Sequence, residues 1–430
     1  MTTKKFNSSR RRLVLGATGL AALGAAAVLR PRDKGQNHSS YFEKMSAALR
    51  NAHFAKPTLV IDRSVLLKNI ETLNGHINGR FDYRVVGKSL PSIPLLQLVM
   101  KEADTNRVMM FHQPFLSEVT AKMPAADVLV GKPMPVAAAE NFYRGYGPES
   151  SFDAERQLQW LIDTPARLHQ YQQLAKSRSI KLQVNIELDV GLHRGGVAIN
   201  EELSAMLLLI DGDPNLSFAG FMGYEPHIAK VPGNKLKLRD KAMTVYSDKL
   251  AIAEQVLGKS LSDLTLNAGG SPTYQYYNEG RFPQNELAAG SCLVKPTDFD
   301  IPSLSDHMPA GFIASPILKT SKGTHVPGVA GLGKAMEWWN PNRAQTFFSY
   351  GGYWKSVPES PKGLVNNPLL GRSTNQEMYN GSNRISLAVD DWMFWRPTQS
   401  EFVFLQFGDI AVYDNGEIVD TWPTFDVNKA

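Results

Sequence analysis

One lysine stands where a buried strand is expected to end, a position at which its amine could act as a nucleophile. Lys88 closes the apolar run 83–87 and precedes Ser89-Leu90-Pro91, a sequence typical of a turn. Burial at the end of a strand disfavours the charged form of an ammonium group and so frees the amine. The position predicts a reactive amine at Lys88, although a lysine taken alone is more often a solvated surface residue.

Several other polar or glycine residues follow apolar runs in the same way. These candidate site residues are Arg194, Tyr224, His227, Gly269, Gly270 and Ser271. Paired glycines such as Gly269 and Gly270 expose backbone N–H groups that can cradle a phosphate. Taken singly, each candidate fits equally well an ion pair, a core polar group or a simple turn, so its meaning depends on the fold.

The segments between these residues alternate between apolar runs and amphipathic helical stretches, the pattern of a parallel α/β fold. The eight expected strands are 83–87, 107–111, 127–130, 160–163, 181–188, 218–223, 264–268 and 286–289. Helices are expected between them, for example over 92–102, 165–176, 201–210 and 236–257. This count predicts a (β/α)8 TIM-type barrel, in which the carboxyl ends of the strands bring their side chains to one mouth.

A short strand over 57–62 and a helix over 64–73 are expected before the barrel, and the sequence changes character from about residue 310. Short β-like runs, Gly and Pro turns and aromatic residues then predominate, which predicts a mostly β C-terminal domain. Its last strands are expected over 402–407, 410–413 and 418–422, with Asp414-Asn415-Gly416 as a hairpin turn. The predicted domains are an export signal over 1–35, a barrel domain over 36–310 and a β domain over 311–430.

The net charge of +5 comes from the N-terminus and does not indicate a nucleic-acid partner. Residues 1–35 hold eight Lys or Arg against one acid, which leaves 38 basic and 40 acidic residues in the rest of the chain. Ser9-Arg10-Arg11-Arg12-Leu13 precedes a segment rich in Ala, Gly and Leu, as in a twin-arginine signal. We therefore expect a periplasmic protein exported by the twin-arginine machinery, with an uncleaved membrane anchor or a basic disordered tail as the alternatives.

Five motifs, in order, resemble the alanine-racemase-like (fold type III) pyridoxal phosphate enzymes, and within them the D-threonine aldolase and D-serine dehydratase branch. The motifs are Pro57–Asp62, Arg84–Lys88, Asp189–Val197, Tyr224–His227 and Ala268–Thr273. Their order and spacing cover roughly residues 55–295 and are jointly specific, whereas a single Gly-Gly-Ser would not be.

The resemblance implies a site for pyridoxal 5'-phosphate. Lys88 would hold this cofactor as a Schiff base, and Gly269, Gly270 and Ser271 would bind its phosphate. The resemblance supports the barrel fold as well, because these residues follow expected strands of one barrel.

The resemblance also assigns residues to the cofactor's ring. Arg194 and Tyr224 would flank its polar edge, and either of them could meet the pyridine nitrogen, which sets how strongly the ring withdraws electrons. His227 would pack near the face of the ring. Catalysis is thereby assigned to Lys88, Tyr224 and His227.

The C-terminal domain departs from the pattern of those lyases, which carry a metal-binding histidine two positions before a cysteine or an aspartate. The corresponding residues here are Gln399 and Glu401, after Pro397. Oxygen ligands suit Mg²⁺, Ca²⁺ or Mn²⁺ better than zinc, and two of them form a weak site. A bound divalent metal is therefore doubtful.

The implied function is a pyridoxal-phosphate-dependent lyase that cleaves or eliminates at the α and β carbons of a D-amino acid or a β-hydroxy-amino acid. A racemase of the same fold is one alternative. A non-catalytic protein that binds pyridoxal phosphate or an amino acid is another, because the metal ligands are missing. The expected partners are a small amino-acid substrate and a second copy of the chain in a homodimer.

Overall fold

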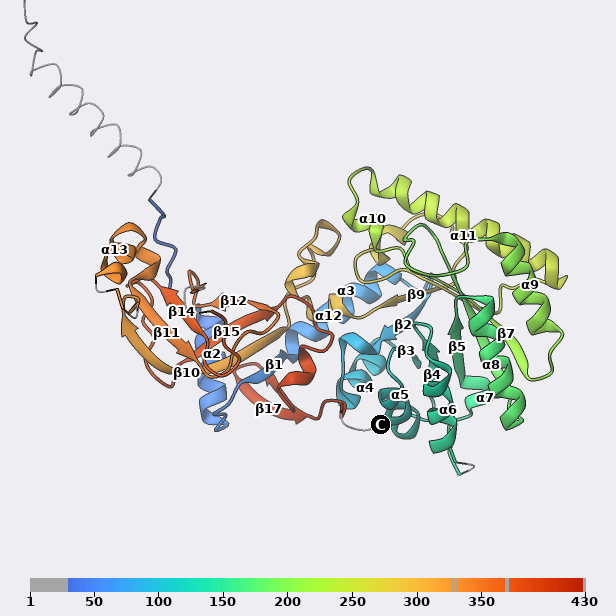
Figure 1. The fold of residues 1–430 in the computed structure, drawn as a ribbon, viewed down its shortest axis with the longest axis horizontal. Coiled ribbons are helices and arrows are strands. Elements are labelled where there is room, and N and C mark those ends of the chain that lie inside the picture. The colour runs from blue at the N-terminus through green and yellow to red at the C-terminus, as the bar shows by residue number, and fades with distance from the viewer. Residues whose placement is uncertain (1–29, 148, 327, 330, 368–370, 428–430) are drawn as a thin grey trace, which may run out of the picture.

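A barrel and a separate β-sheet region lie side by side in the computed structural model, as Figure 1 shows. The structure describes residues 30–147, 149–326, 328–329, 331–367 and 371–427. Most of the predicted export signal, residues 1–29, lies outside these ranges. Within them, no helix has both the length and the apolar character needed to cross a membrane.

Eight parallel strands close into a barrel in chain order, which confirms the predicted (β/α)8 architecture. They are β2 (Asp82–Val86), β3 (Arg107–Met110), β4 (Asp127–Val130), β5 (Leu158–Ile162), β6 (Leu182–Leu188), β7 (Leu216–Gly223), β8 (Thr265–Ala268) and β9 (Glu286–Ala289). Most of their residues are buried, as expected for parallel strands that are covered on the outside and packed on the inside.

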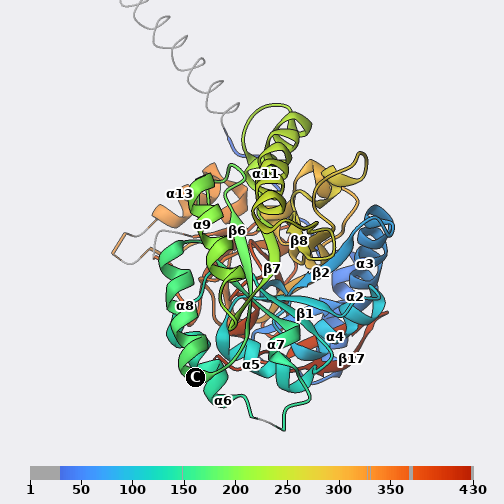
Figure 2. The same ribbon diagram turned by 90° about the vertical axis from the view of Figure 1, so that its right-hand side faces the viewer.

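Helices surround the barrel on its outer side (Figure 2). They are α3 (Arg63–Ile77), α4 (Ile93–Glu102), α5 (Gln113–Lys122), α6 (Val136–Gly145), α7 (Ala154–Gln157), α8 (Pro165–Arg178), α9 (Asn200–Asp211), α10 (His227–Lys230), α11 (Lys235–Leu257) and α12 (Ser291–Val294). Side chains of Asp62, Thr164 and Asn234 cap α3, α8 and α11 by accepting backbone N–H bonds. Such caps fix where each helix begins.

The remaining strands form a nine-stranded sheet with the order β13-β14-β11-β10-β1-β16-β17, to which β15 and β12 are attached through β10. They are β1 (Thr58–Asp62), β10 (Gly311–Lys322), β11 (Gln345–Ser349), β12 (Ser356–Ser360), β13 (Val365–Asn366), β14 (Met378–Gly381), β15 (Trp392–Pro397), β16 (Ile410–Asp414) and β17 (Glu417–Trp422). The helices α2 (Ser40–Asn51) and α13 (Leu332–Trp339) complete this region.

Strand β1 lies in this second sheet although it precedes the barrel in the chain. It pairs antiparallel with β10 and parallel with β16. The predicted barrel domain begins at residue 36, whereas the first strand of the closed barrel is β2. From residue 30 onward, the chain therefore passes from the sheet region through the whole barrel and back to the sheet.

The strand predicted over 402–407 is wrong. A turn and the short 3-10 helix Phe404–Gln406 stand there instead. Phe402 has a φ of +55°, a left-handed backbone that a strand does not accommodate. Val403 is only 2% exposed, so the apolar pattern of this segment reflects burial and not extension.

The predicted hairpin after β16 is confirmed. Strands β16 and β17 pair antiparallel, with Asp414 opposite Glu417. Asn415 and Gly416 between them have φ values of +49° and +100°, as a two-residue hairpin loop requires.

Charged side chains are bonded to one another inside the barrel. Arg84 and Glu286 are both fully buried and are joined from Nε to Oε1 at 2.6 Å. Arg84 also pairs with Asp127 at 3.0 Å, and Arg107 reaches Glu286 at 2.9 Å. Asn267 donates its amide to Glu286 at 2.7 Å. These bonds join β2, β3, β4, β8 and β9 to one another in the barrel interior.

Candidate active site

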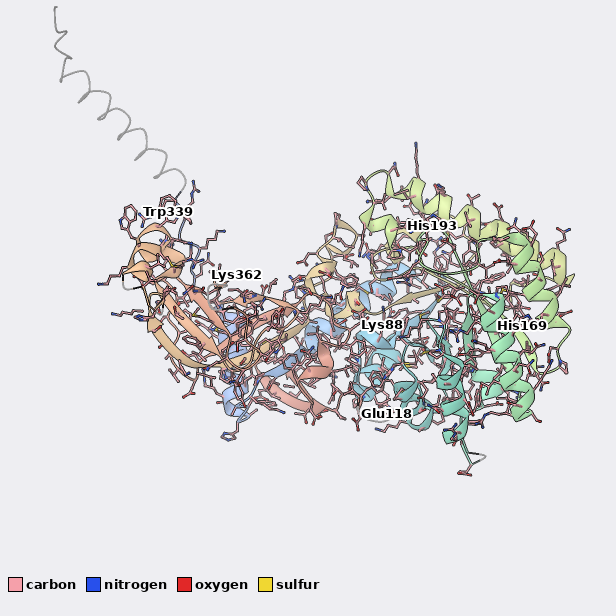
Figure 3. The ribbon with its side chains drawn as sticks, viewed as in Figure 1. Lys88, Glu118, His169, His193, Trp339 and Lys362 are labelled. Atoms are coloured by element: carbon pink, nitrogen blue, oxygen red, sulfur yellow. The ribbon has the colours of Figure 1, made fainter. Side chains whose placement is uncertain are left out.

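Lys88 lies at the end of β2, in the short 3-10 helix Gly87–Ser89, on the side of the barrel that faces the sheet region (Figure 3). Its Nζ stands 3.2 Å from Oε1 of Glu401 and 4.9 Å from the centre of the Phe111 ring. The side chain is 39% exposed. The expected dry surroundings are therefore absent, because a carboxylate from the other region reaches the amine and solvent has access to it.

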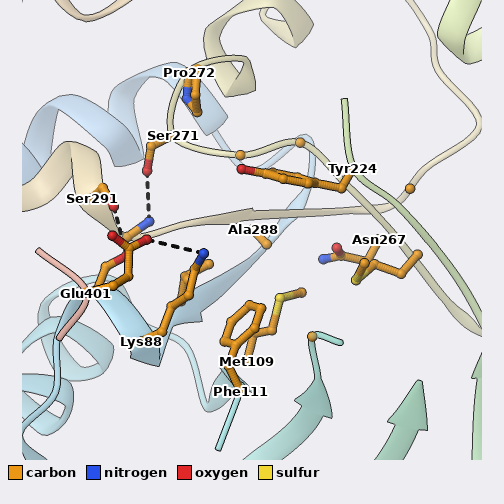
Figure 4. A pocket seen from close by; sticks show the side chains of 18 of the residues that line it. Lys88, Met109, Phe111, Tyr224, Asn267, Ser271, Pro272, Ala288, Ser291 and Glu401 are labelled. Carbon is orange, nitrogen blue, oxygen red and sulfur yellow. Dashed lines mark hydrogen bonds and ion pairs between the residues drawn. The ribbon is translucent and has the colours of Figure 1, made fainter. Parts of the chain in front are cut away.

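Glu401 belongs to the turn that follows β15, 313 positions after Lys88 in the chain. Figure 4 shows its carboxylate and the Lys88 amine joined at one end of a pocket. From the sequence, Glu401 is a doubtful metal ligand, or a group that assists the β-hydroxyl in place of the metal. In the structure it is the ion-pair partner of the predicted nucleophile.

Gln399, the other residue considered for a metal, has different partners. Its Oε1 accepts a hydrogen bond from Nζ of Lys355, and its Nε2 donates to Asp298 at 3.0 Å. Within the described ranges, no three His, Cys, Asp or Glu side chains come together as metal ligands would. The amide oxygen that a metal would need is thus bonded to a lysine.

The conformation of the glycine turn after β8 is fixed by its neighbours Tyr224 and Glu225. Gly269 has a φ of +81°. A Cβ on Gly270 would lie 2.8 Å from Cε2 of Tyr224, so the ring packs directly against the backbone. Glu225, which is fully buried, accepts hydrogen bonds from N of Gly269 at 3.3 Å and from Oγ1 of Thr273 at 2.8 Å. Glu225 therefore fixes both ends of the turn.

Ser271 ties this turn to the end of β9. Its Oγ accepts hydrogen bonds from N of Gly290 at 3.1 Å and from N of Cys292 at 3.0 Å. The hydroxyls of Ser89 and Ser291 lie 2.8 Å apart and join the end of β2 to the same segment. The ends of β2, β8 and β9 are thereby held together.

Tyr224 and Arg194 lie next to each other at the mouth. The Arg194 guanidinium stands 5.0 Å from the centre of the Tyr224 ring, within the range of a cation–π contact. Burial raises the pKa of Tyr224 to about 12, with Arg194 opposing the shift and Glu225 and Glu401 adding to it. The phenol is accordingly protonated at neutral pH and can donate a hydrogen bond.

His227 is not brought into the same space. It begins α10, and its ring is absent from the lining of the cavities at the mouth. Its Nε2 lies 3.4 Å from the point that a Cβ on Gly191 would occupy, and its Nδ1 is buried without a hydrogen-bond partner. Burial lowers the pKa of His227, so the ring is neutral at pH 7.

An inner cavity of about 570 Å³, including its open side, collects the other candidates. Its polar lining is Lys88, Ser89, Arg194, Tyr224, Asn267, Gly269, Gly270, Ser271, Ser291 and Glu401. Val86, Met109, Met222 and Ala288 supply apolar walls. A larger outer space of about 1930 Å³ continues from it toward solvent.

Three residues near this space were not singled out from the sequence. Glu225 stands between Tyr224 and Pro226, and Asn267 lies two residues before Gly269. Glu187 lines the outer space from the end of β6, where an acidic residue inside an apolar run was the available signal.

Glu187 is unusual because it is buried and forms no ion pair with any residue that the structure describes. Its residue exposure is 8%, and its charged neighbours act on it only at longer range. Burial raises its pKa to about 7, with Arg194 opposing the shift and Asp163 and Asp189 adding to it. A carboxyl group of this kind exchanges its proton near neutral pH.

The model of the alanine racemase N-terminal domain matches residues 61–296 of the chain. Among solved structures, D-threonine aldolase from Filomicrobium marinum is similar with a TM-score of 0.68 at 14% identity, over 85% of this chain and 94% of that one. No match to this sequence is found among curated proteins.

Two further solved structures extend the comparison. D-threo-3-hydroxyaspartate dehydratase from Delftia sp. HT23 has a TM-score of 0.63 at 14% identity, over 86% of this chain and 98% of that one. Alanine racemase from Bacillus anthracis has a TM-score of 0.63 at 13% identity, over 86% and 98%. At such low identity these likenesses show a shared fold.

Proposed function

The chain belongs to the alanine racemase N-terminal domain family, and on this premise we propose that it is a pyridoxal-phosphate-dependent lyase. The proposed substrate is a D-amino acid or a β-hydroxy-amino acid, cleaved or dehydrated at its α and β carbons. The observation that carries the proposal is the placement of the Lys88 amine and the open glycine turn on one cavity.

The residues of the inner cavity fit the cofactor. The inner cavity combines apolar walls with a few polar side chains, as small-ligand sites commonly do. A Cβ on Gly270 would clash with the Tyr224 ring, so a glycine is required there, and Glu225 holds the turn, whose residues line the cavity. Lys88 would bind the aldehyde carbon, and Gly269, Gly270 and Ser271 would hold the phosphate.

When bound, pyridoxal phosphate withdraws electrons from the α-carbon of an amino acid and so weakens the bonds at that carbon. Lys88 would take or return a proton at the α-carbon. Tyr224, protonated at neutral pH, and Arg194 would donate hydrogen bonds or charge to the polar edge of the ring. His227 lies outside the cavity, so it would have no contact with the reacting atoms and would only pack against the neighbouring loop at Gly191.

Lyase chemistry is favoured by two of the similar structures, whose names are D-threonine aldolase and D-threo-3-hydroxyaspartate dehydratase. Racemisation is the second candidate. It needs acid–base groups on both faces of the α-carbon. Lys88 and Tyr224, which reach the same inner cavity from β2 and β7, are the observation that favours it.

The first test is spectroscopic. Protein purified with added pyridoxal phosphate should show a visible absorption band that borohydride removes, and Lys88→Ala should lack this band. Lys132→Ala changes a lysine of the outer space and should keep it. A parent protein without the band, or a Lys88→Ala variant that retains it, would overturn the cofactor assignment.

The reaction is then identified from its products. D-threonine, D-serine, D-threo-3-hydroxyaspartate and D-alanine are incubated with the parent and with Lys88→Ala. Glycine with an aldehyde indicates an aldolase, a keto acid with ammonia indicates a dehydratase, and the mirror-image amino acid indicates a racemase. The variant should lose at least about 100-fold in rate, the usual effect of removing an acid–base group.

A further inference from the structure

The position of Glu401 distinguishes it from the other acidic residues near the mouth of the barrel. Among the described residues it is the one carboxylate that lines the inner cavity, and it also lines the outer space. Its Oε1 is 3.2 Å from Nζ of Lys88, a distance across which a proton can pass directly. Neither the family match nor the similar structures assign it a role.

The segment that carries Glu401 is held at the mouth by backbone bonds. Thr398 donates its N–H to O of Lys355 at 2.9 Å, and Asp298 donates its N–H to O of Thr398 at 3.1 Å. The side-chain bonds of Gln399 to Lys355 and Asp298 reinforce this attachment. Glu401 is thus presented to Lys88 by a fixed loop.

We propose that Lys88 and Glu401 form a proton relay that connects the α-carbon of the substrate with its β-hydroxyl group. The inference rests on the proposed lyase function and deepens it, because it names the acid–base group for the β-substituent. It also implies that the substrate carries a β-hydroxyl group.

In a dehydration, Lys88 takes the proton from the α-carbon and passes it to the Glu401 carboxylate. Glu401 then gives this proton to the β-hydroxyl as the Cβ–O bond breaks. The electrons of the Cα–H bond form the Cα–Cβ double bond, and those of the Cβ–O bond leave with water. Lys88 ends as an amine and Glu401 as a carboxylate, so no further reactant is needed.

In an aldol cleavage the same relay runs in the opposite direction. Glu401 takes the proton of the β-hydroxyl as the Cα–Cβ bond breaks and the aldehyde carbonyl forms. The proton then passes to Lys88. Lys88 delivers it to the α-carbon, where the electrons of the broken Cα–Cβ bond form the new C–H bond. Tyr224 is a poorer acceptor for the hydroxyl proton, since burial raises its pKa to about 12.

The test uses Glu401→Gln and measures proton exchange at the α-carbon separately from bond breaking at the β-carbon. Exchange of the substrate's α-hydrogen with deuterium from the solvent, followed by NMR, should stay within about threefold of the parent. Formation of keto acid or aldehyde should fall at least about 100-fold. Glu401→Asp should restore part of the loss. Asp163→Asn removes a carboxylate that lines only the outer space, and it should keep both rates.

A second readout does not depend on turnover. Acetylation of Lys88 by acetic anhydride at neutral pH, measured by mass spectrometry without cofactor, should be about two- to fivefold faster in Glu401→Gln. The Glu401 carboxylate is bonded to the Lys88 amine in the parent, and its loss leaves the amine open to the reagent. Asp163→Asn should leave this rate unchanged.

Two results would overturn the relay. Equal loss of exchange and of product in Glu401→Gln would mean that Glu401 only positions Lys88, and unaltered product formation would mean that it has no part in the reaction. Failure of the proposed function looks different: the parent itself would show neither exchange nor product, and the relay would fall with it whatever the acetylation rates.

Discussion

Two ion pairs that begin four residues apart on the same stretch of chain differ in almost every physical respect. In the barrel interior, Arg84 and Glu286 are fully buried, 2.6 Å apart, and further bonded to neighbouring strands. At the mouth, Lys88 and Glu401 are 3.2 Å apart, with side chains 39% and 24% exposed. The first pair joins strands of one barrel, and the second joins two regions of the molecule.

The difference shows that equal charges serve unequal purposes according to burial. A buried pair is costly to break because the remaining charge loses its partner in a medium that solvates it poorly. An exposed pair contributes little to stability, because water competes for both charges. The interior pair is therefore suited to hold the barrel together, and the mouth pair is free to exchange partners and protons.

Breaking the interior pair should have the largest effect. Arg84→Met leaves Glu286 buried with Arg107 as its remaining charged partner, and the free energy of unfolding should fall by roughly 3–5 kcal/mol. Urea unfolding followed by circular dichroism measures this. A loss below about 1 kcal/mol would show that the interior network does not stabilise the barrel.

Glu187 gives an intermediate case, because it is buried like Glu286 but has no ion pair. Burial raises its pKa from 4.5 to about 7, so the folded protein keeps a proton that the unfolded chain has released in this window. Its contribution to stability is therefore lost as the pH rises from about 4.5 to 7, by up to about 3 kcal/mol.

Glu187→Gln removes this titration. Relative to the parent, the variant should gain up to about 3 kcal/mol in the free energy of unfolding between pH 4 and pH 8. Unfolding curves of both proteins at the two pH values make the comparison. A constant difference across the window would mean that folding does not raise the pKa of Glu187.

The smallest effect on stability is expected at the mouth. Glu401→Gln removes an ion pair of two partly exposed side chains and should change the free energy of unfolding by less than about 1 kcal/mol. Thermal unfolding of Glu401→Gln and Arg84→Met, measured together, would show whether loss of the buried pair costs more stability than loss of the exposed pair. A loss as large as that of Arg84→Met would give the mouth pair a structural role.

The barrel could be predicted because its signals are local. Each strand is an apolar run between turns, and the helices between them show helical periodicity, so all eight strands were located within a few residues. The hairpin at Asn415 and Gly416 followed from two residues that tolerate positive φ. The strand predicted over 402–407 was wrong, because a short apolar segment that is buried in a turn has the same sequence pattern as a buried strand.

The candidate site was only partly visible for the same reason. Lys88, Tyr224, Arg194 and the glycine turn each follow a strand, and a closed barrel brings such positions together whatever the loops between them. His227 follows a strand too, but its helix carries it outside the cavity. The position of a residue after a strand therefore predicts at which end of the barrel it lies, but it does not predict whether its side chain points into the cavity.

By itself the sequence determined the barrel, the lysine at the end of its first strand and the turn that faces it, because short-range patterns encode these features. Only the tertiary structure decided that β1 joins the second sheet, that Glu187 is buried without an ion pair in the described part of the chain, and that Glu401 reaches Lys88 across 313 positions. Such contacts depend on how whole elements pack, and no local pattern of residues records which distant segment will fill a given space.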